Sequence, residues 1–317
     1  MRTRALGRSG LQVSEISLGS WLTLGSRVDF AETSRLIHQA FDLGIILFDT
    51  ADVYAQGEAE KALGEALSSL PRPHVVIATK CFFANSEHPN DRGLSRKHIF
   101  ESVEGSLRRL GTDYIDLHHC HRADPDTPIE ETVRAYEDLI RQGKLLYWGV
   151  SHWDASQIEE ACGMADFHGG FRPISSQPEY SILGREIEGG VLEASEREGL
   201  GQIVFSPLAQ GVLTGKYTGG KVPEQSRAND PKRNLWMNDY LDPELLERID
   251  QLRPIADELG ISMAQLALAW CLRQQGVSSV IIGATRGEQL EENVKAVGIE
   301  LPEAALAEID TLFSGPS

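Results

Sequence analysis

The sequence predicts one α/β domain over residues 1–317, folded as a closed (β/α)8 or TIM barrel, with an N-terminal β-hairpin and a long basic loop after the seventh strand. Short apolar runs alternate with helical patterns eight times without an internal linker. Three successive runs end in Asp49, Lys80 and His121, and the ends of parallel strands carry the chemistry of α/β folds. No Gly-x-Gly-x-x-Gly turn of an open dinucleotide-binding sheet is present, so a barrel is favoured.

The first half of the chain supplies four of these units. Residues 2–13 predict a hairpin, because Gly7 and Gly10 lie between two short runs. Gly111 and Gly143 lie where helix C-caps are expected. The strands and helices are expected at 16–19 and 29–43, 45–48 and 58–69, 75–79 and 95–110, and 114–120 and 129–142.

The second half continues the alternation and then interrupts it. Strands and helices are expected at 145–150 and 154–163, at 173–177 and 186–198, and at 202–206. A segment without regular structure follows from 208 to 242, and loops of this length are usually binding loops or lids. Helices at 243–259 and 262–274, a strand at 278–282 and a helix at 287–297 complete the eight units.

Charge and composition restrict the partners. The chain is 41% hydrophobic and 24% charged, as in soluble globular proteins, and its net charge is −17. Nucleic acids and anionic membranes bind proteins through Lys and Arg, so neither is an expected partner. A small molecule is expected instead, and a homo-oligomer is left open.

The N-terminus and the cysteines indicate a cytoplasmic protein. The first ten residues lack the apolar stretch of an export signal, and no apolar run approaches the roughly 18 residues of a membrane span. The four cysteines are scattered and have no Cys-x-x-Cys spacing, so we expect reduced thiols rather than disulfides or a zinc site.

Four side chains at the expected barrel mouth suit one kind of chemistry. A phenol has an ordinary pKa of about 10, so Tyr54 needs a cation beside it to act as a proton donor at neutral pH. Lys80 supplies that cation and lowers the pKa of Tyr54, burial opposes this effect, and Asp49 keeps Lys80 charged. With His121 as a second donor, the group can protonate a carbonyl oxygen during reduction by hydride, without a metal.

Other interpretations apply to single residues. Asp49 alone can end a loop, and Lys80 alone can form a structural ion pair. His119 and His121 share one face of an extended strand, but Cys120 faces the other way, so we predict no metal site. We expect His118 and His119 to be packed or hydrogen-bonded inside the fold. Trp21 suits either the core or the substrate cavity.

Three motifs that carry these four residues, the tetrad of Asp49, Tyr54, Lys80 and His121, resemble those of a known family. FDTADVY at 48–54, ATK at 78–80 and DYIDLHHCHR at 113–122 resemble the aldo-keto reductase superfamily over nearly the whole chain. LYWGVS, SPLAQGVLTGKY and IIGATRGEQLEEN are similar to the branch that contains the β-subunits of voltage-gated potassium channels and related bacterial reductases. Channel β-subunits usually carry Asn at the position of His121 and Arg at that of His152, so the resemblance favours a soluble enzyme.

The resemblance implies NADP(H) as cofactor, lying across the barrel mouth. It places Ser151, His152 and Gln177 at the nicotinamide carboxamide, and we expect Tyr180 to stack under the nicotinamide ring. The resemblance also implies that Asp49 contacts the cofactor, in addition to its place in the tetrad. The remaining matched positions are Ser20, Trp21, Phe205, Ser206, Pro207, Leu208, Gln210, Lys216, Arg227, Gly283, Thr285, Gln289, Glu292 and Asn293.

The charge of the long loop supports phosphate binding independently. Basic residues outnumber acids between 216 and 233, although the whole chain is strongly acidic; the basic ones are Lys216, Lys221, Arg227, Lys232 and Arg233, and the acids are Glu224 and Asp230. A basic lid of this kind beside the expected helix start at 285–287 suits a dinucleotide, and especially a 2′-phosphate.

We therefore expect NADPH-dependent reduction of aldehydes or ketones, with Tyr54 as general acid. One alternative is an NADP(H)-binding redox sensor or regulatory subunit with slow turnover. Another is a barrel isomerase or lyase in which Tyr54 and Lys80 move protons without hydride, and this alternative predicts no nicotinamide binding.

Overall fold

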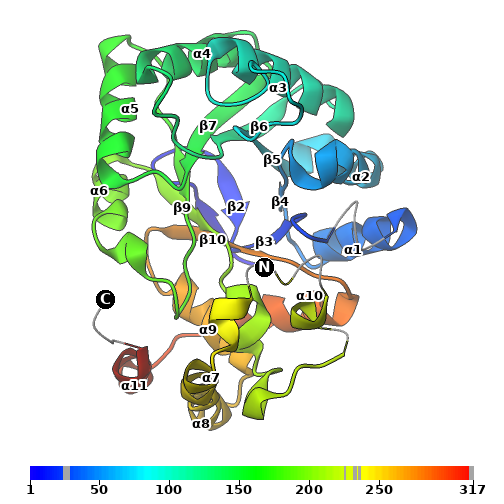
Figure 1. The fold of residues 1–317 in the computed structure, drawn as a ribbon, viewed down its shortest axis with the longest axis vertical. Helices are drawn as coiled ribbons and strands as arrows, with labels where there is room; N and C mark the ends of the chain where they lie inside the picture. The colour runs from blue at the N-terminus through cyan, green and yellow to red at the C-terminus, as the bar shows by residue number, and fades with distance from the viewer. Residues whose placement is uncertain (24–28, 225, 231–233, 235–236, 314–317) are drawn as a thin grey trace.

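Eight parallel strands close into a barrel, as the alternating pattern predicts (Figure 1). The computed structural model describes residues 1–23, 29–224, 226–230, 234 and 237–313. The barrel strands are β3 (Ile16–Gly19), β4 (Leu47–Asp49), β5 (Val76–Cys81), β6 (Ile115–Cys120), β7 (Leu145–Ser151), β8 (Ser175–Gln177), β9 (Gly201–Val204) and β10 (Val277–Ile282). They pair in chain order, and β10 pairs with β3 to close the ring.

The hairpin of β1 (Thr3–Ala5) and β2 (Gln12–Ser14) packs at the end of the barrel where the strands begin. Leu6 and Val13 are fully buried against early strand residues such as Leu47 and Leu117. Gly7 is required at the contact, because its φ is +58° and a Cβ there would lie 2.2 Å from the carbonyl oxygen of Gly199. This end is therefore plugged, and the opposite end remains for a site.

Helices surround the strands, and α1 to α6 follow one another around the barrel in Figure 1. Their bounds are α1 (Phe30–Asp42), α2 (Glu58–Leu67), α3 (Arg96–Leu110), α4 (Ile129–Arg141), α5 (Ala155–Phe167) and α6 (Val191–Glu198). Local capping defines several ends: Asp29 accepts a hydrogen bond from the amide of Glu32 at the start of α1, and Gly111 takes the left-handed conformation after α3.

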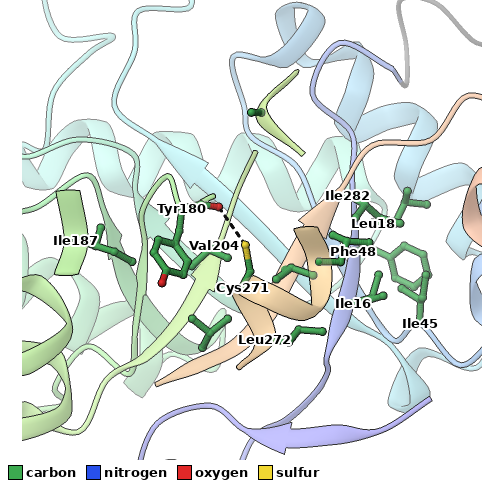
Figure 2. Close-up of a cluster of buried hydrophobic side chains, with 14 of the residues drawn as sticks. Ile16, Leu18, Ile45, Phe48, Tyr180, Ile187, Val204, Cys271, Leu272 and Ile282 are labelled. Carbon is green, nitrogen blue, oxygen red and sulfur yellow. Dashed lines mark hydrogen bonds between the residues drawn. The ribbon is translucent and has the colours of Figure 1, made fainter. Parts of the chain in front are cut away.

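The last third holds α7 (Pro243–Asp250), α8 (Leu252–Glu258), α9 (Met263–Leu272), α10 (Gly287–Asn293) and α11 (Glu303–Phe313). Every side chain of α9 except Gln265 is buried, and Cys271 and Leu272 belong to the hydrophobic core drawn in Figure 2. In the described part of the chain no single helix is long and apolar enough to cross a membrane. By length and composition alone, the bent pair Pro243–Glu258 and Met263–Leu272 passes that test together.

Four details differ from the sequence prediction. The helix expected at 243–259 is broken at Gln251, because Pro254 lacks an N–H and its ring crowds the carbonyl of Asp250. The helix expected at 186–198 starts as a separate 3-10 turn, Glu186–Glu188, before two glycines. The described parts of segment 208–242 form short 3-10 helices, Ala209–Thr214, Thr218–Gly220, Arg227–Asn229 and Asn238–Leu241. Helix α11 was not expected.

Candidate active site

A cavity of about 2050 Å³ lies at the end of the barrel where the strands finish. Every predicted site residue except Lys80 and Tyr180 lines it: Ser20, Trp21, Asp49, Tyr54, His121, Ser151, His152, Gln177, Phe205, Ser206, Pro207, Leu208, Gln210, Lys216, Arg227, Gly283, Thr285, Gln289, Glu292 and Asn293. Lys80 is 1% exposed and lies beneath the surface of the cavity, paired with Asp49. The volume is large enough for a dinucleotide together with a small substrate.

A buried ion pair forms the base of the site. The Lys80 Nζ lies 2.5 Å from Asp49 Oδ1 and also donates to the carbonyl oxygen of Thr50 at 2.7 Å. Burial is the largest single effect and favours the neutral amine, but the charges of Asp49 and Tyr54 and the hydrogen bonds to them together outweigh it and raise the pKa of Lys80 above its ordinary value. The expectation that Asp49 keeps Lys80 charged is confirmed.

The second oxygen of Asp49 connects the pair to the neighbouring strands. Gln177 donates its Nε2 to Asp49 Oδ2 at 2.9 Å, and Ser151 donates its hydroxyl to the backbone oxygen of Gln177 at 2.7 Å. Both carboxylate oxygens of Asp49 therefore have partners, so its orientation is fixed. Ser151 and Gln177, the residues expected near a carboxamide, lie side by side at the ends of β7 and β8.

Tyr54 lies above this pair on the turn that follows β4. The next two residues, Ala55 and Gln56, have φ values of 48° and 56°, a strained backbone of the kind that clusters at functional sites. The Tyr54 hydroxyl lies 3.5 Å from His121 Nε2, and Lys80 Nζ lies 5.1 Å from the centroid of the Tyr54 ring. The hydroxyl therefore faces a donor from β6 and a cation from β5.

Burial outweighs the neighbouring cation in setting the pKa of Tyr54. Burial raises the pKa of Tyr54, Lys80 opposes this effect, and Asp49 adds to it, so the net pKa lies above the ordinary value of the phenol. Lys80 lowers the pKa of Tyr54 and burial raises it, as expected, and burial is the larger of the two effects. The phenol stays protonated at neutral pH, which a proton donor requires.

His121 faces the same point of the cavity. Burial lowers its pKa well below the ordinary range, and the positive charges of Lys80 and Arg122 add to the effect, so the imidazole is neutral. Its ring meets Tyr54 edge-on, with centroids 5.7 Å apart. Within the described residues Nδ1 has no hydrogen-bond partner. A neutral imidazole beside the phenol can donate to one carbonyl oxygen.

His118, His119 and Cys120 alternate between two environments. His118 and Cys120 both contact the hydroxyl of Tyr136 on α4, while His119 Nε2 lies 2.9 Å from the Ser175 hydroxyl on β8. The predicted facing of Cys120 away from His119 is confirmed. These side chains do not converge on one point, and the expected packed, hydrogen-bonded role of His118 and His119 is confirmed.

The buried histidines should make the fold sensitive to acid. Burial lowers the pKa of His118 to about 3 and those of His119 and His121 well below the ordinary range, so all three bind protons only on unfolding. The contribution of each histidine to the free energy of unfolding is therefore complete above a pH of about 6.5 and is lost as the pH falls below it. The loss between pH 7 and pH 5.5 is about 1.3 kcal/mol for each histidine. Asp52 opposes this in part, because burial raises its pKa to about 7.

Urea unfolding of the wild type and of His118→Gln at these two pH values tests the effect. The variant should lose about 1.3 kcal/mol less than the wild type on acidification. An equal loss in both proteins would show that His118 does not contribute.

The groove beyond the tetrad is built by the segment after β9. Arg227 donates to the side-chain oxygen of Gln210, and its guanidinium lies 5.6 Å from the ring centroid of Trp21. Gln210 and Ser206 are strained, with φ values of 58° and 54°. Trp21 lines the cavity, so of its two interpretations the cavity residue is confirmed and the core residue is not. Lys232 and Arg233 of the predicted basic lid lie outside the described residues.

Tyr180 is not in the cavity, which corrects the expectation that it stacks under a nicotinamide. It is fully buried, packs on Trp270 with ring centroids 5.0 Å apart, and donates its hydroxyl to Glu188 at 2.5 Å. Figure 2 shows it in the hydrophobic core beside Val204 and Cys271. Successive side chains alternate in the extended segment after β8, so Glu179 faces the cavity and Tyr180 faces the helices. Phe205 is the aromatic residue that lines the cavity there, with His152 5.0 Å away.

Arg122 and Phe83 are among the lining residues that were not predicted. Arg122 directly follows His121, and Phe83 follows the end of β5 by two residues. Both residues could have been predicted from the sequence, because each comes just after an expected barrel strand and so lies at the mouth.

Comparisons with known proteins show the family of the chain. The model of the aldo/keto reductase family matches residues 15–313. A protein of Arabidopsis thaliana named as a probable voltage-gated potassium channel subunit beta is 47% identical over 303 residues, covering 94% of this chain and 92% of the relative. A Schizosaccharomyces pombe protein named as a putative subunit of the same kind is 44% identical over 321 residues, covering 98% and 93%.

Proposed function

The chain belongs to the aldo/keto reductase family, and from this premise we propose that it reduces aldehyde or ketone carbonyls to alcohols with NADPH. The observation that carries the proposal is the meeting of the Tyr54 hydroxyl, the His121 imidazole and the buried Lys80–Asp49 pair at one point of the cavity. Residues 1–317 would act as one barrel domain, in the cytoplasm.

Each side chain has a separate role in this mechanism. His121 Nε2 and the Tyr54 hydroxyl hold the substrate carbonyl oxygen between them. Tyr54 transfers its proton to that oxygen as negative charge develops there, and Lys80 stabilises the resulting phenolate. Asp49 keeps Lys80 protonated and in place, and Gln177 keeps Asp49 oriented. NADPH, when bound, supplies the hydride.

The groove residues fit that cofactor. Ser151 can accept from a carboxamide, Gln177 can both donate to it and accept from it, and Phe205 offers an aromatic face near them. Ser206, Pro207, Leu208 and Gln210 would follow the pyrophosphate, while Lys216 and Arg227 supply cations. Gly283, Thr285, Gln289, Glu292 and Asn293 would border the adenosine. Gln289 already accepts from the amide of Thr285 at 2.8 Å, so this corner is ordered.

Arg227 gives the proposal a specific prediction. Arg227→Ala should raise the NADPH dissociation constant about 10- to 100-fold, because charge-assisted hydrogen bonds to the 2′-phosphate are lost, and should leave NADH binding within about threefold. Fluorescence titration of both nucleotides measures this. Lys221→Ala is the matched control, since Lys221 is exposed in the same segment and does not line the cavity. Equal weakening of NADPH and NADH binding would show that Arg227 does not contact the 2′-phosphate.

A second candidate function is an NADP(H)-binding redox sensor that reports to a partner. The naming of both relatives as voltage-gated potassium channel β-subunits favours it. Reduction of an aldehyde and dicarbonyl panel, followed through the loss of NADPH absorbance, separates the two. Turnover supports the reductase, and tight NADPH retention with negligible turnover supports the sensor. A protein that binds no nicotinamide contradicts both functions and supports the isomerase or lyase alternative.

A further inference from the structure

Arg122 places a fixed positive charge beside the proposed proton donors. It follows β6, lines the cavity and is half-buried. Its Nη1 donates to the carbonyl oxygen of His121 at 2.7 Å, and its guanidinium lies 5.3 Å from the ring centroid of Phe83. The Phe83 ring in turn lies 5.0 Å from the His121 ring. The guanidinium is therefore held one side chain away from the point where His121 meets Tyr54.

This charge has no carboxylate partner among the described residues. No Asp or Glu oxygen in the described ranges lies within 4.0 Å of the guanidinium, although the chain holds 47 acids and 30 basic residues. Asp124, two residues away, is engaged by the amide of Leu94 and the hydroxyl of Thr127, at 2.7 and 2.8 Å. Burial lowers the pKa of Arg122, and Tyr54 is the one group that raises it. A partly desolvated guanidinium gains by meeting an anion.

The cofactor does not account for this cation. In the barrel order β6 lies four strands from β10 and three from β9, so Arg122 is on the opposite rim from the segments that would hold the adenosine and the phosphates. Lys216 and Arg227 both follow β9. The neighbours of Arg122 are instead Phe83 and His121, at the substrate end.

We propose that Arg122 binds an anionic group of the substrate, so that the preferred substrates are short aldehydes or ketones that carry a carboxylate or a phosphate a few atoms from the carbonyl. The inference rests on the reductase function proposed above and names its substrate class. The carbonyl oxygen would lie between Tyr54 and His121, the short chain would cross the Phe83 ring, and the anion would meet the guanidinium through two parallel hydrogen bonds.

Matched charged and neutral substrates test the proposal. Succinic semialdehyde is compared with butanal, and glyceraldehyde 3-phosphate with glyceraldehyde, by kcat/KM in wild type, Arg122→Met, Arg122→Lys and Arg92→Met. The wild type should prefer an anionic substrate by about tenfold or more, and the pair with the larger ratio distinguishes carboxylate from phosphate. Arg122→Met should reduce that ratio about 10- to 100-fold, mainly through KM, and Arg122→Lys should reduce it less.

Arg92→Met is the control, because Arg92 is exposed in the neighbouring loop and does not line the cavity. It should leave both rates unchanged. A wild-type ratio near one, or a ratio that survives Arg122→Met, would overturn the proposal while leaving the reductase function intact. An equal loss on charged and neutral substrates would also overturn it and make Arg122 a positioning residue for His121.

If no carbonyl is reduced, the reductase function fails first, and calorimetry still decides the anion site. Succinate and succinamide are titrated into the protein with NADP⁺ present. Succinate binding that is lost in Arg122→Met supports the anion site; no preference for succinate, or equal succinate binding in the variant, contradicts it.

Discussion

Tyr54→Phe should lower kcat for carbonyl reduction by about 10²- to 10⁴-fold, the usual contribution of a general acid. The substitution removes one hydroxyl, and the ring that packs edge-on against His121 remains. NADPH affinity should stay within about twofold of the wild type, because the Tyr54 hydroxyl has no role in holding the nucleotide. Loss of NADPH absorbance measures the rate, and fluorescence titration measures the affinity.

Tyr136→Phe provides a matched control for the loss of a buried phenol. Tyr136 is fully buried, and its hydroxyl contacts His118 and Cys120 on the helix side of β6. Its removal should reduce stability by about 1 kcal/mol and leave kcat unchanged. A Tyr54→Phe variant that keeps more than about a tenth of the wild-type rate would exclude Tyr54 as the proton donor.

The pH dependence gives a second check on Tyr54. Because burial raises the pKa of the phenol above its ordinary value, the donor form persists through neutral and mildly alkaline pH. We therefore expect no decline in kcat from ionisation of Tyr54 below a pH of about 10. A decline near neutrality that disappears in Tyr54→Phe would contradict this electrostatic balance.

The barrel and its tetrad could be predicted because their signals are local. A buried strand is a short apolar run, and the first polar residue after it lies at the mouth whatever the rest of the chain does. Asp49 and Lys80 were recognised in this way, and the alternation of His118, His119 and Cys120 followed from strand geometry. These features need no knowledge of distant contacts.

The features that escaped prediction depend on distant contacts or on irregular backbone. The sequence does not show which of Tyr180 and Phe205 faces the cavity, because both lie just outside regular strands. The net pKa shift of Tyr54 depends on burial by residues from several elements. Arg122 was visible beside His121, but only the structure shows that the acids around it are engaged elsewhere.

Lys80→Met should reduce both activity and stability, because it leaves the Asp49 carboxylate buried without its cation. Removing one partner of a buried ion pair typically costs about 3–5 kcal/mol in the free energy of unfolding. Without Lys80 the phenolate of Tyr54 loses its stabilising charge, so kcat should fall by about 10²-fold or more. Urea unfolding and the NADPH assay measure the two effects.

Two further variants separate the effects. Arg72→Met breaks another partly buried pair, with Asp116 at 2.7 Å, near the start of β6 and away from the cavity, so it should lose stability and keep kcat. Adding Asp49→Asn to Lys80→Met removes the unpaired charge, so the double variant should recover part of the stability but none of the activity. Recovery of activity would show that Lys80 acts only by supporting the fold.

The pH dependence of the Lys80→Met deficit follows from the same charge. A carboxylate buried without a cation has a pKa above its ordinary value of about 3.9, so the folded variant binds a proton at Asp49 before the unfolded chain does. Its penalty is therefore present at high pH and is relieved as pH falls through the raised pKa. We expect the stability difference from wild type to be larger at a pH of about 8 than at about 5. A difference that does not change with pH would mean that the lost energy comes from packing of the lysine chain and not from the stranded charge of Asp49.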